Sequence, residues 1–177
     1  MAEFDMAGFI RTVLDGHVQP LTVVSVEPRE SANSYTITLR LDAKQLAHLP
    51  AGLRAMLEPQ CEEPLIVVAV WDEANKRMTL LIRTVRFVGS PSNRARALEI
   101  ANEHNNTVGY VSRLSIIDRG NHMDAGLSVS QQVPLPEHSD ISAQILLGTV
   151  LQLAMEAGNA ATMLIANLER DASAPAH

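Results

Sequence analysis

Hydrophobic and polar residues alternate with clear periods along the first part of the chain. Between residues 3 and 15 the apolar positions recur every three or four residues, which predicts an amphipathic helix that ends at Gly16. The β-branched runs 21–28 and 34–41 predict two strands, and the turn-forming sequence RESANS between them predicts a hairpin.

The segment 42–60 carries helical signals that are interrupted. Asp42 can cap the start of a helix, with Gln45 as its capping-box partner. Pro50 and Gly52 then break the pattern, so we expect either two short helices or one kinked helix.

Two strongly apolar runs follow this segment. Residues 64–71, PLIVVAVW, predict a strand that is covered on both faces or lies in the centre of a sheet. After the turn sequence DEAN, residues 76–88 predict a second strand, whose later half alternates. Strict alternation places Arg83 and Arg86 on opposite faces and therefore does not predict a paired basic groove.

The segment 91–104 is predicted to be a helix, because Ser90 is a good N-cap and Pro91 favours the first helical position. The residues expected on its inward face are Leu98, Ala101 and Asn105, with Ala97 and Ile100 beside them.

The sequence ANEHNN at the end of this helix is a candidate functional site. Asn102 and Asn105 lie one turn apart, so both side chains can face the same way. In the structural interpretation, Asn105 or Asn106 takes a left-handed C-cap and the other side chain fastens the helix end to a strand. The alternative is that the asparagines bind a ligand.

The last third of the chain predicts two strands and a long helix. The strands are expected at 107–117 and 123–133, joined by the turn DRGN, with Leu114 more buried than Arg113. The helix expected over 141–168 is apolar nearly all round, so it must be buried by the sheet and by something else as well.

These elements follow the order α–ββ–(α)–ββ–α–ββ–α. Short turns between strands imply an antiparallel sheet, and helices grouped on one face define an α+β fold. We expect a single domain over residues 1–170 and a frayed tail over 171–177.

Composition limits the classes of function. The 177 residues carry a formal net charge of −6, which argues against nucleic acid as the main partner. The N-terminus has no basic region of the kind that begins a secretory signal, and no apolar run is long enough to span a membrane. We therefore expect a cytoplasmic protein.

The sequence contains no motif that predicts catalysis, a cofactor or a metal. The six histidines form no HExxH motif, and the glycine-rich phosphate-binding motifs are absent. Cys61 is the single cysteine, and the neighbouring acids should raise its pKa, which disfavours a reactive thiolate. The stretch GNHMDAG joins two predicted strands and is interpreted as a hairpin loop. We thus expect a non-enzyme without resident metal or cofactor.

The C-terminal half resembles a known family. The sequence ALEIANEHNNTVGYVSRLSIID, followed by MDAGLSVSQQVPL and the long helix, is similar to the YbjN family of bacterial proteins over residues 90–166. That resemblance implies the fold of type III secretion chaperones: a curved antiparallel sheet flanked by helices, often dimeric and without catalysis. The insert 42–60 and the sequence IIDRGNHMD, in place of an acidic DxDGD hairpin tip, depart from the family pattern.

The expected function is a chaperone-like or regulatory module that binds a polypeptide through an apolar surface or a sheet edge. The alternatives are a small-molecule-binding or enzymatic domain with a pocket between sheet and helices, and a structural subunit of a larger assembly. We also expect a homodimer, with the helix 141–168 or a neighbouring sheet edge at a two-fold interface.

Overall fold

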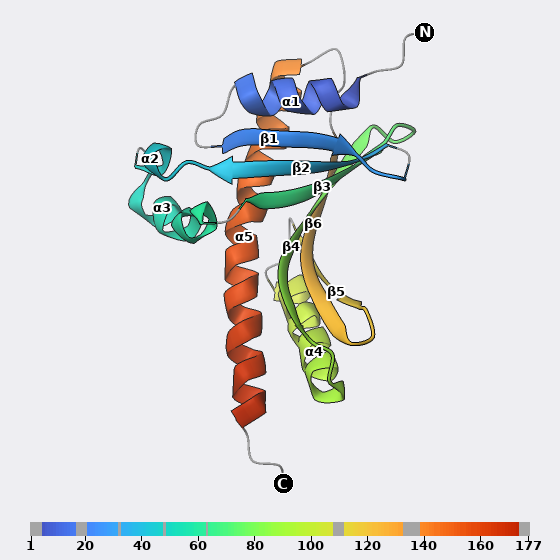
Figure 1. Ribbon diagram of the computed structural model, residues 1–177, viewed down its shortest axis with the longest axis vertical. Coiled ribbons are helices and arrows are strands. Elements are labelled where there is room, and N and C mark those ends of the chain that lie inside the picture. Colours follow the sequence, from blue (N-terminus) through green and yellow to red (C-terminus); the bar gives the residue numbers. More distant parts are fainter. Residues whose placement is uncertain are drawn as a thin grey trace.

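A computed structural model describes residues 5–16, 21–31, 33–47, 49–62, 64–107, 112–132 and 139–173 (Figure 1). The helices are α1 (Met6–Gly16), α2 (Ala43–Leu46), α3 (Ala51–Leu57), α4 (Pro91–Thr107) and α5 (Ser139–Ser173), with a 3-10 turn, η1 (Glu58–Cys61), after α3. The strands are β1 (Leu21–Pro28), β2 (Ser34–Leu41), β3 (Leu65–Asp72), β4 (Arg77–Val88), β5 (Arg113–Asp118) and β6 (His122–Gln132).

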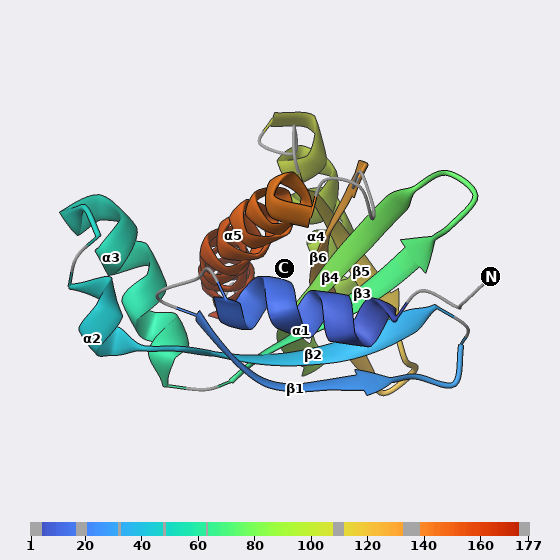
Figure 2. The same ribbon diagram turned by 90° about the horizontal axis from the view of Figure 1, so that it is seen from above.

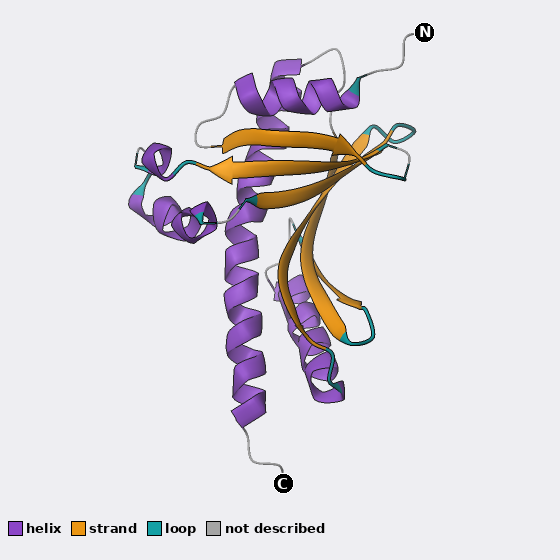
Figure 3. Cartoon of the chain, viewed as in Figure 1, coloured by secondary structure: helices purple, strands orange, loops and turns teal. Residues whose placement is uncertain are grey.

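The six strands form one antiparallel sheet in the order β1-β2-β3-β4-β6-β5 (Figure 3). Every neighbouring pair is antiparallel, which confirms the predicted α+β class with an antiparallel sheet flanked by helices. The strands β1 and β2 coincide with the predicted runs 21–28 and 34–41. Period-two patterning was a reliable signal here because one face of each strand is buried.

The helices α1, α4 and α5 pack on the same face of a strongly curved sheet (Figures 1 and 2). The long helix α5 crosses β4 and β6 and also contacts α1, α3 and α4. The buried apolar residues form one cluster, which includes Ile37, Leu39, Val67, Leu80, Leu127, Leu153 and Leu164. The face of the sheet that contributes to this cluster is called the inner face, and the opposite face is called the outer face.

The insert 42–60 is built into this core. Of the two alternatives, two short helices are present, and Asp42 accepts a hydrogen bond from the Lys44 backbone N–H at 2.9 Å. Leu46 and Leu57 are buried, at 1% and 2% exposure, and α3 packs on α5. The insert therefore supplies part of the cover that α5 needs beyond the sheet.

Helix α4 differs from its prediction in length and in its buried face. It runs to Thr107, and Leu98, which was expected to point inward, is 51% exposed. The buried residues are Ala97, Ile100, Ala101 and His104. The helix is rotated by about one residue because small alanines, rather than Leu98, face the sheet and allow close approach.

The boundaries of β5 and α5 were also partly wrong. Strand β5 begins at Arg113 instead of 107; residues 108–111 lie outside the described part of the chain. Helix α5 continues to Ser173, so the first residues of the predicted tail 171–177 are helical. Its surface is less uniformly apolar than expected, since Gln144, Asn159 and Thr162 line an exposed side.

Strand β3 is a central strand but is not covered on both faces. Its residues alternate between buried and more exposed, and Ile66 and Val70 are 56% and 42% exposed on the outer face. The register Thr36↔Val68 continues this uncovered surface onto β2. A continuous apolar run does not distinguish a doubly covered strand from one whose apolar outer face is left open.

Candidate functional site

A β-bulge in β4 places two arginines on the same face of the sheet. Arg83 pairs with Gly126 and Val85 pairs with Ala125, so Thr84 is the extra residue in β4. The Thr84 hydroxyl donates a hydrogen bond to the Ala125 carbonyl at 3.2 Å. The bulge shifts the alternation by one residue, and the expectation that Arg83 and Arg86 lie on opposite faces was wrong.

These arginines belong to a cluster around Asp124, which we call the Asp124 cluster: Asp124, Arg83, Arg86, Arg119 and His122. Asp124 is only 3% exposed. Arg86 Nε donates a hydrogen bond to Asp124 Oδ1 at 2.9 Å, while the nearest nitrogens of Arg83 and Arg119 lie 3.8 Å from Oδ2. His122 Nε2 is 4.0 Å from the same oxygen.

Electrostatics keeps Asp124 ionised. The hydrogen bond from Arg86 is the main cause that lowers the pKa of Asp124, and the charges of Arg83, Arg86 and His122 lower it further against an opposing effect of burial. The same hydrogen bond raises the pKa of Arg86. Without counting His122, the cluster holds three guanidinium charges against one carboxylate, so it is cationic although the chain as a whole is acidic.

A cleft opens beside this cluster, where the sheet divides. The pairing of β3 with β4 ends at Val67↔Ile82, and beyond that point the β4 residues 83–88 pair with β6 on one side only. No described strand pairs with their other edge. In Figure 1, β3 and the later half of β4 diverge at this point, with α5 alongside.

The cavity between the diverging strands, which we call the β3–β4 cleft, has a volume of about 540 Å³. Its lining includes three arginines, Arg29, Arg83 and Arg86, and one acid, Glu62. The aliphatic part of the lining comes from Ile66, Val68, Leu81 and Val85 of the sheet and from Ala157 and Ala161 of α5. The cleft therefore presents cations beside an apolar floor.

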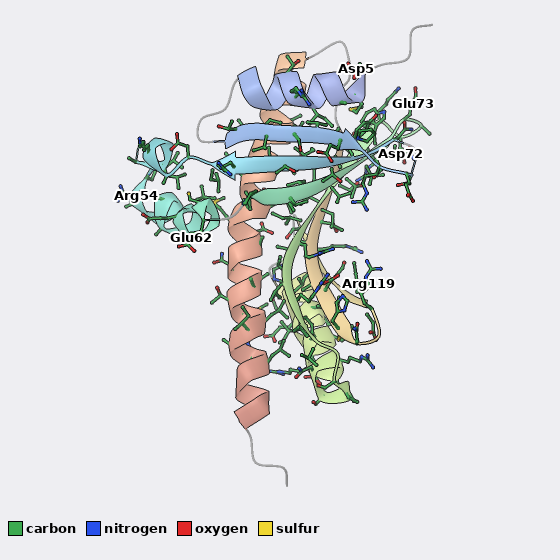
Figure 4. The ribbon with its side chains drawn as sticks, in the orientation of Figure 1. Asp5, Arg54, Glu62, Asp72, Glu73 and Arg119 are labelled. Atoms are coloured by element: carbon green, nitrogen blue, oxygen red, sulfur yellow. The ribbon has the colours of Figure 1, made fainter. Side chains whose placement is uncertain are left out.

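Figure 4 shows how charged side chains are distributed around the sheet. Arg119 lies at the β5–β6 hairpin, while Glu62 lies at the far end of the insert. Asp72 and Glu73 gather at the β3–β4 turn, away from both. Of these acids, Asp72 and Glu73 lie away from the Asp124 cluster, whereas Glu62 lines the β3–β4 cleft.

Asn105 of the sequence ANEHNN closes one edge of the sheet. Asn105 Nδ2 donates to the Leu114 carbonyl at 2.9 Å, and the Leu114 N–H donates to Asn105 Oδ1 at 2.8 Å. The amide thereby occupies the outer edge of β5 as a neighbouring strand would. The predicted tie between helix and strand is confirmed. The predicted left-handed cap is wrong, because Asn105 and Asn106 both lie within α4 at ordinary φ.

The other edge strand, β1, is protected differently. Its register shifts between Val23 and Ser25, and it ends at Pro28, which has no N–H to donate. Both outer edges of the sheet are therefore blunted. The free edge of β4 inside the cleft carries a bulge at Thr84 but contains no proline.

Of the remaining sequences singled out above, Asn102 and Cys61 do not form a site, whereas GNHMDAG contributes two residues to the Asp124 cluster. Asn102 is exposed and does not join the contact that Asn105 makes. Burial raises the pKa of the Cys61 thiol, and Glu58 and Asp42 raise it further, so the direction expected from the sequence is confirmed. His122 and Asp124 come from the stretch GNHMDAG; the hairpin turn precedes His122, and both residues lie in β6.

Within the described part of the chain, His, Cys, Asp and Glu side chains form no group of three that could hold a metal ion. The helices described here include none that is long and apolar enough to cross a membrane.

No protein-family model matches the chain, and neither a curated protein nor a solved structure is similar to it at a significant level. Function is therefore inferred from the geometry of the cleft and the cluster.

Proposed function

We propose that the protein is a non-enzymatic, chaperone-like or regulatory module that binds an extended polypeptide segment in the β3–β4 cleft. The observation that carries this proposal is the unpaired edge of β4 over residues 83–88. An exposed strand edge offers backbone N–H and C=O groups in register for an added strand, and neighbouring pockets select its side chains.

The position of this open edge supports a role in binding. Proteins protect open edges because these promote uncontrolled association. Here β5 is closed by Asn105 and β1 carries a bulge and Pro28. An edge left open between two strands, beside the exposed Ile66, admits a narrow extended chain but hinders a second folded sheet.

The resemblance to the YbjN family supports the same proposal. That resemblance implies a type III secretion chaperone-like fold without catalysis, and a curved antiparallel sheet flanked by helices is compatible with it. The cytoplasmic location expected from the N-terminal sequence is part of the same proposal. We include membership of this family in the proposal.

Selection from a random peptide library tests the proposal. The variant Ile66→Asp places a charge in the cleft at a side chain that is 56% exposed, so it should fold. Val24→Asp makes the same change at a 57% exposed residue of β1, outside the cleft, and is the matched control. We expect selected peptides to bind the native protein and Val24→Asp but to lose affinity for Ile66→Asp. Failure to select any peptide, or equal binding to both variants, would contradict the proposal.

A second candidate function is favoured by the volume of the cleft. About 540 Å³, bounded by the sheet and by Ala157 and Ala161 of α5, lies within the range of small-molecule sites. A small anionic ligand that raises the melting temperature, and that displaces no selected peptide, would favour this alternative.

We also propose a homodimer. A two-fold contact through the Asp124 cluster would place arginines against their own copies, so the outer face is disfavoured as the interface. The exposed side of α5, with Ile141 at 53% and Ile165 at 42% exposure, is the better candidate. Within one chain α5 is covered by the sheet and by α1, α3 and α4, so only its exposed side is left for such an interface.

A further inference from the structure

We propose that Arg83, Arg86 and Arg119 form a carboxylate-binding site that recognises a Glu or Asp side chain of the bound polypeptide. This inference rests on the proposed function and specifies the chemistry of the partner. Arg83 and Arg86 also line the β3–β4 cleft, so the cluster and the cleft are continuous.

The hydrogen bonds within the cluster leave donors free. Arg86 alone donates a hydrogen bond to Asp124. At 3.8 Å, Arg83 and Arg119 are attracted to the carboxylate without a hydrogen bond, and in the described part of the chain neither donates one elsewhere. A guanidinium has five N–H donors in a planar fork that matches a carboxylate in two-point geometry. The side chains are 60%, 55% and 53% exposed for Arg83, Arg86 and Arg119, so a ligand can reach them.

Asp124 organises the cluster but does not neutralise it. One buried carboxylate cannot balance three guanidinium groups, and the remaining charge repels further cations while attracting an anion. If Asp124 served only to stabilise the fold, a single arginine would satisfy it. The two additional arginines at 3.8 Å are better explained by a second carboxylate that completes the network.

The surroundings favour a side-chain carboxylate over a polyanion. Ile66, Val68 and Leu81 adjoin the arginines in the cleft and match the aliphatic neighbours of an acidic residue in an extended chain. A nucleic acid would require basic residues along its length and aromatic faces for its bases. The chain instead has a net charge of −6 and 3% aromatic residues. A second copy of this chain, related by two-fold symmetry, would bring cation against cation.

Peptides from the library selection are the probes. We expect them to be enriched in Glu and Asp. When each acidic residue is changed to its amide, fluorescence anisotropy should show one Glu→Gln or Asp→Asn change that weakens binding by about tenfold or more, the effect of losing a hydrogen bond between charged groups. The variant Arg83→Gln should weaken binding of the acidic peptide to the same extent. It should not weaken binding of the amide peptide any further. Arg113→Gln, on the outer face of β5 but outside the cluster, should leave both affinities unchanged.

The outcomes separate the two proposals. If peptides bind the cleft but their amide versions bind equally well, the carboxylate site is refuted and polypeptide binding stands. If no peptide binds, both proposals fail. Inorganic phosphate is the competing probe: if it displaces acidic peptides and binds the native protein but not Arg83→Gln, the cluster is a phosphate site and the assignment to a peptide carboxylate is overturned.

Discussion

Replacement of Asn105 by leucine should destabilise the fold without altering the cleft. Leucine is close to asparagine in size but can neither donate to the Leu114 carbonyl nor accept from its N–H. Both hydrogen bonds, at 2.9 and 2.8 Å, would be lost; they join the partly buried Asn105 to Leu114, which is 2% exposed.

The magnitude follows from the two bonds. Each contributes a net free energy of about 0.5–1.5 kcal/mol, so the free energy of unfolding should fall by about 1–3 kcal/mol. For a chain of this length that corresponds to a decrease in melting temperature of about 2–12 °C. The uncovered β5 edge should also make the variant more prone to associate during unfolding.

Chemical denaturation followed by circular dichroism measures this change, and Asn106→Leu is the matched control. Asn106 is exposed and lies next in the same final turn of α4, so any change in helix propensity is shared by the two variants. The difference in the free energy of unfolding between the two variants therefore gives the contribution of the hydrogen bonds to Leu114.

A third variant, Asn105→Asp, separates the two bonds. The introduced carboxylate still accepts from the Leu114 N–H but repels its carbonyl oxygen, so the variant should be destabilised at neutral pH. Because a protonated carboxyl can donate to that carbonyl, the pKa of the introduced carboxyl should be raised in the folded state. The loss of stability relative to the native protein should therefore become smaller as the pH falls through that pKa. Equal stability of Asn105→Leu and Asn106→Leu would refute the reasoning. A stable Asn105→Leu that no longer binds peptide would make this a functional site.

Three further predictions follow from the core, the cluster and α5. Leu57→Ala should lower the free energy of unfolding by about 2–5 kcal/mol in denaturant titrations, because the insert belongs to the core; an effect near zero would make it an appendage. The pKa of Asp124 is lowered in the folded state, so its stabilisation is present above the unfolded pKa of about 3.9 and is lost as the pH falls through the lower folded pKa. Asp124→Asn should therefore reduce stability at neutral pH and flatten its decline in acid, and an unchanged slope would contradict this. Sedimentation equilibrium at micromolar protein should give the mass of a dimer, whereas the mass of one chain throughout would exclude self-association.

Most of the fold could be predicted from the sequence because local patterns agree with the tertiary environment. The hairpin β1–β2 combines β-branched runs with turn residues, and Ser90 caps α4 as expected, since the Asn93 N–H donates to its hydroxyl at 3.2 Å. Leu114 is buried and Arg113 exposed, as the alternation predicted.

The candidate site was missed because it depends on one extra residue. Nothing in the sequence RTVRFV distinguishes the bulge at Thr84 from regular alternation, yet that bulge decides whether Arg83 and Arg86 share a face. One signal was available in the strand lengths: β4 spans 12 residues and β3 only 8, so part of β4 must extend beyond its neighbour. The convergence of Arg119 and His122 on Asp124 is a consequence of pairing and could not be obtained from spacing alone.

Backbone hydrogen exchange is the most direct test of polypeptide binding in the cleft. Amide exchange of the native protein is measured by mass spectrometry with and without a peptide selected from the library. An added strand should protect amides of β4 within residues 83–88, since their free edge gains a hydrogen-bonded neighbour. The β1 and β5 edges should exchange as before. Protection confined to β1 or β5, or no change at 83–88 at a saturating peptide concentration, would contradict the account.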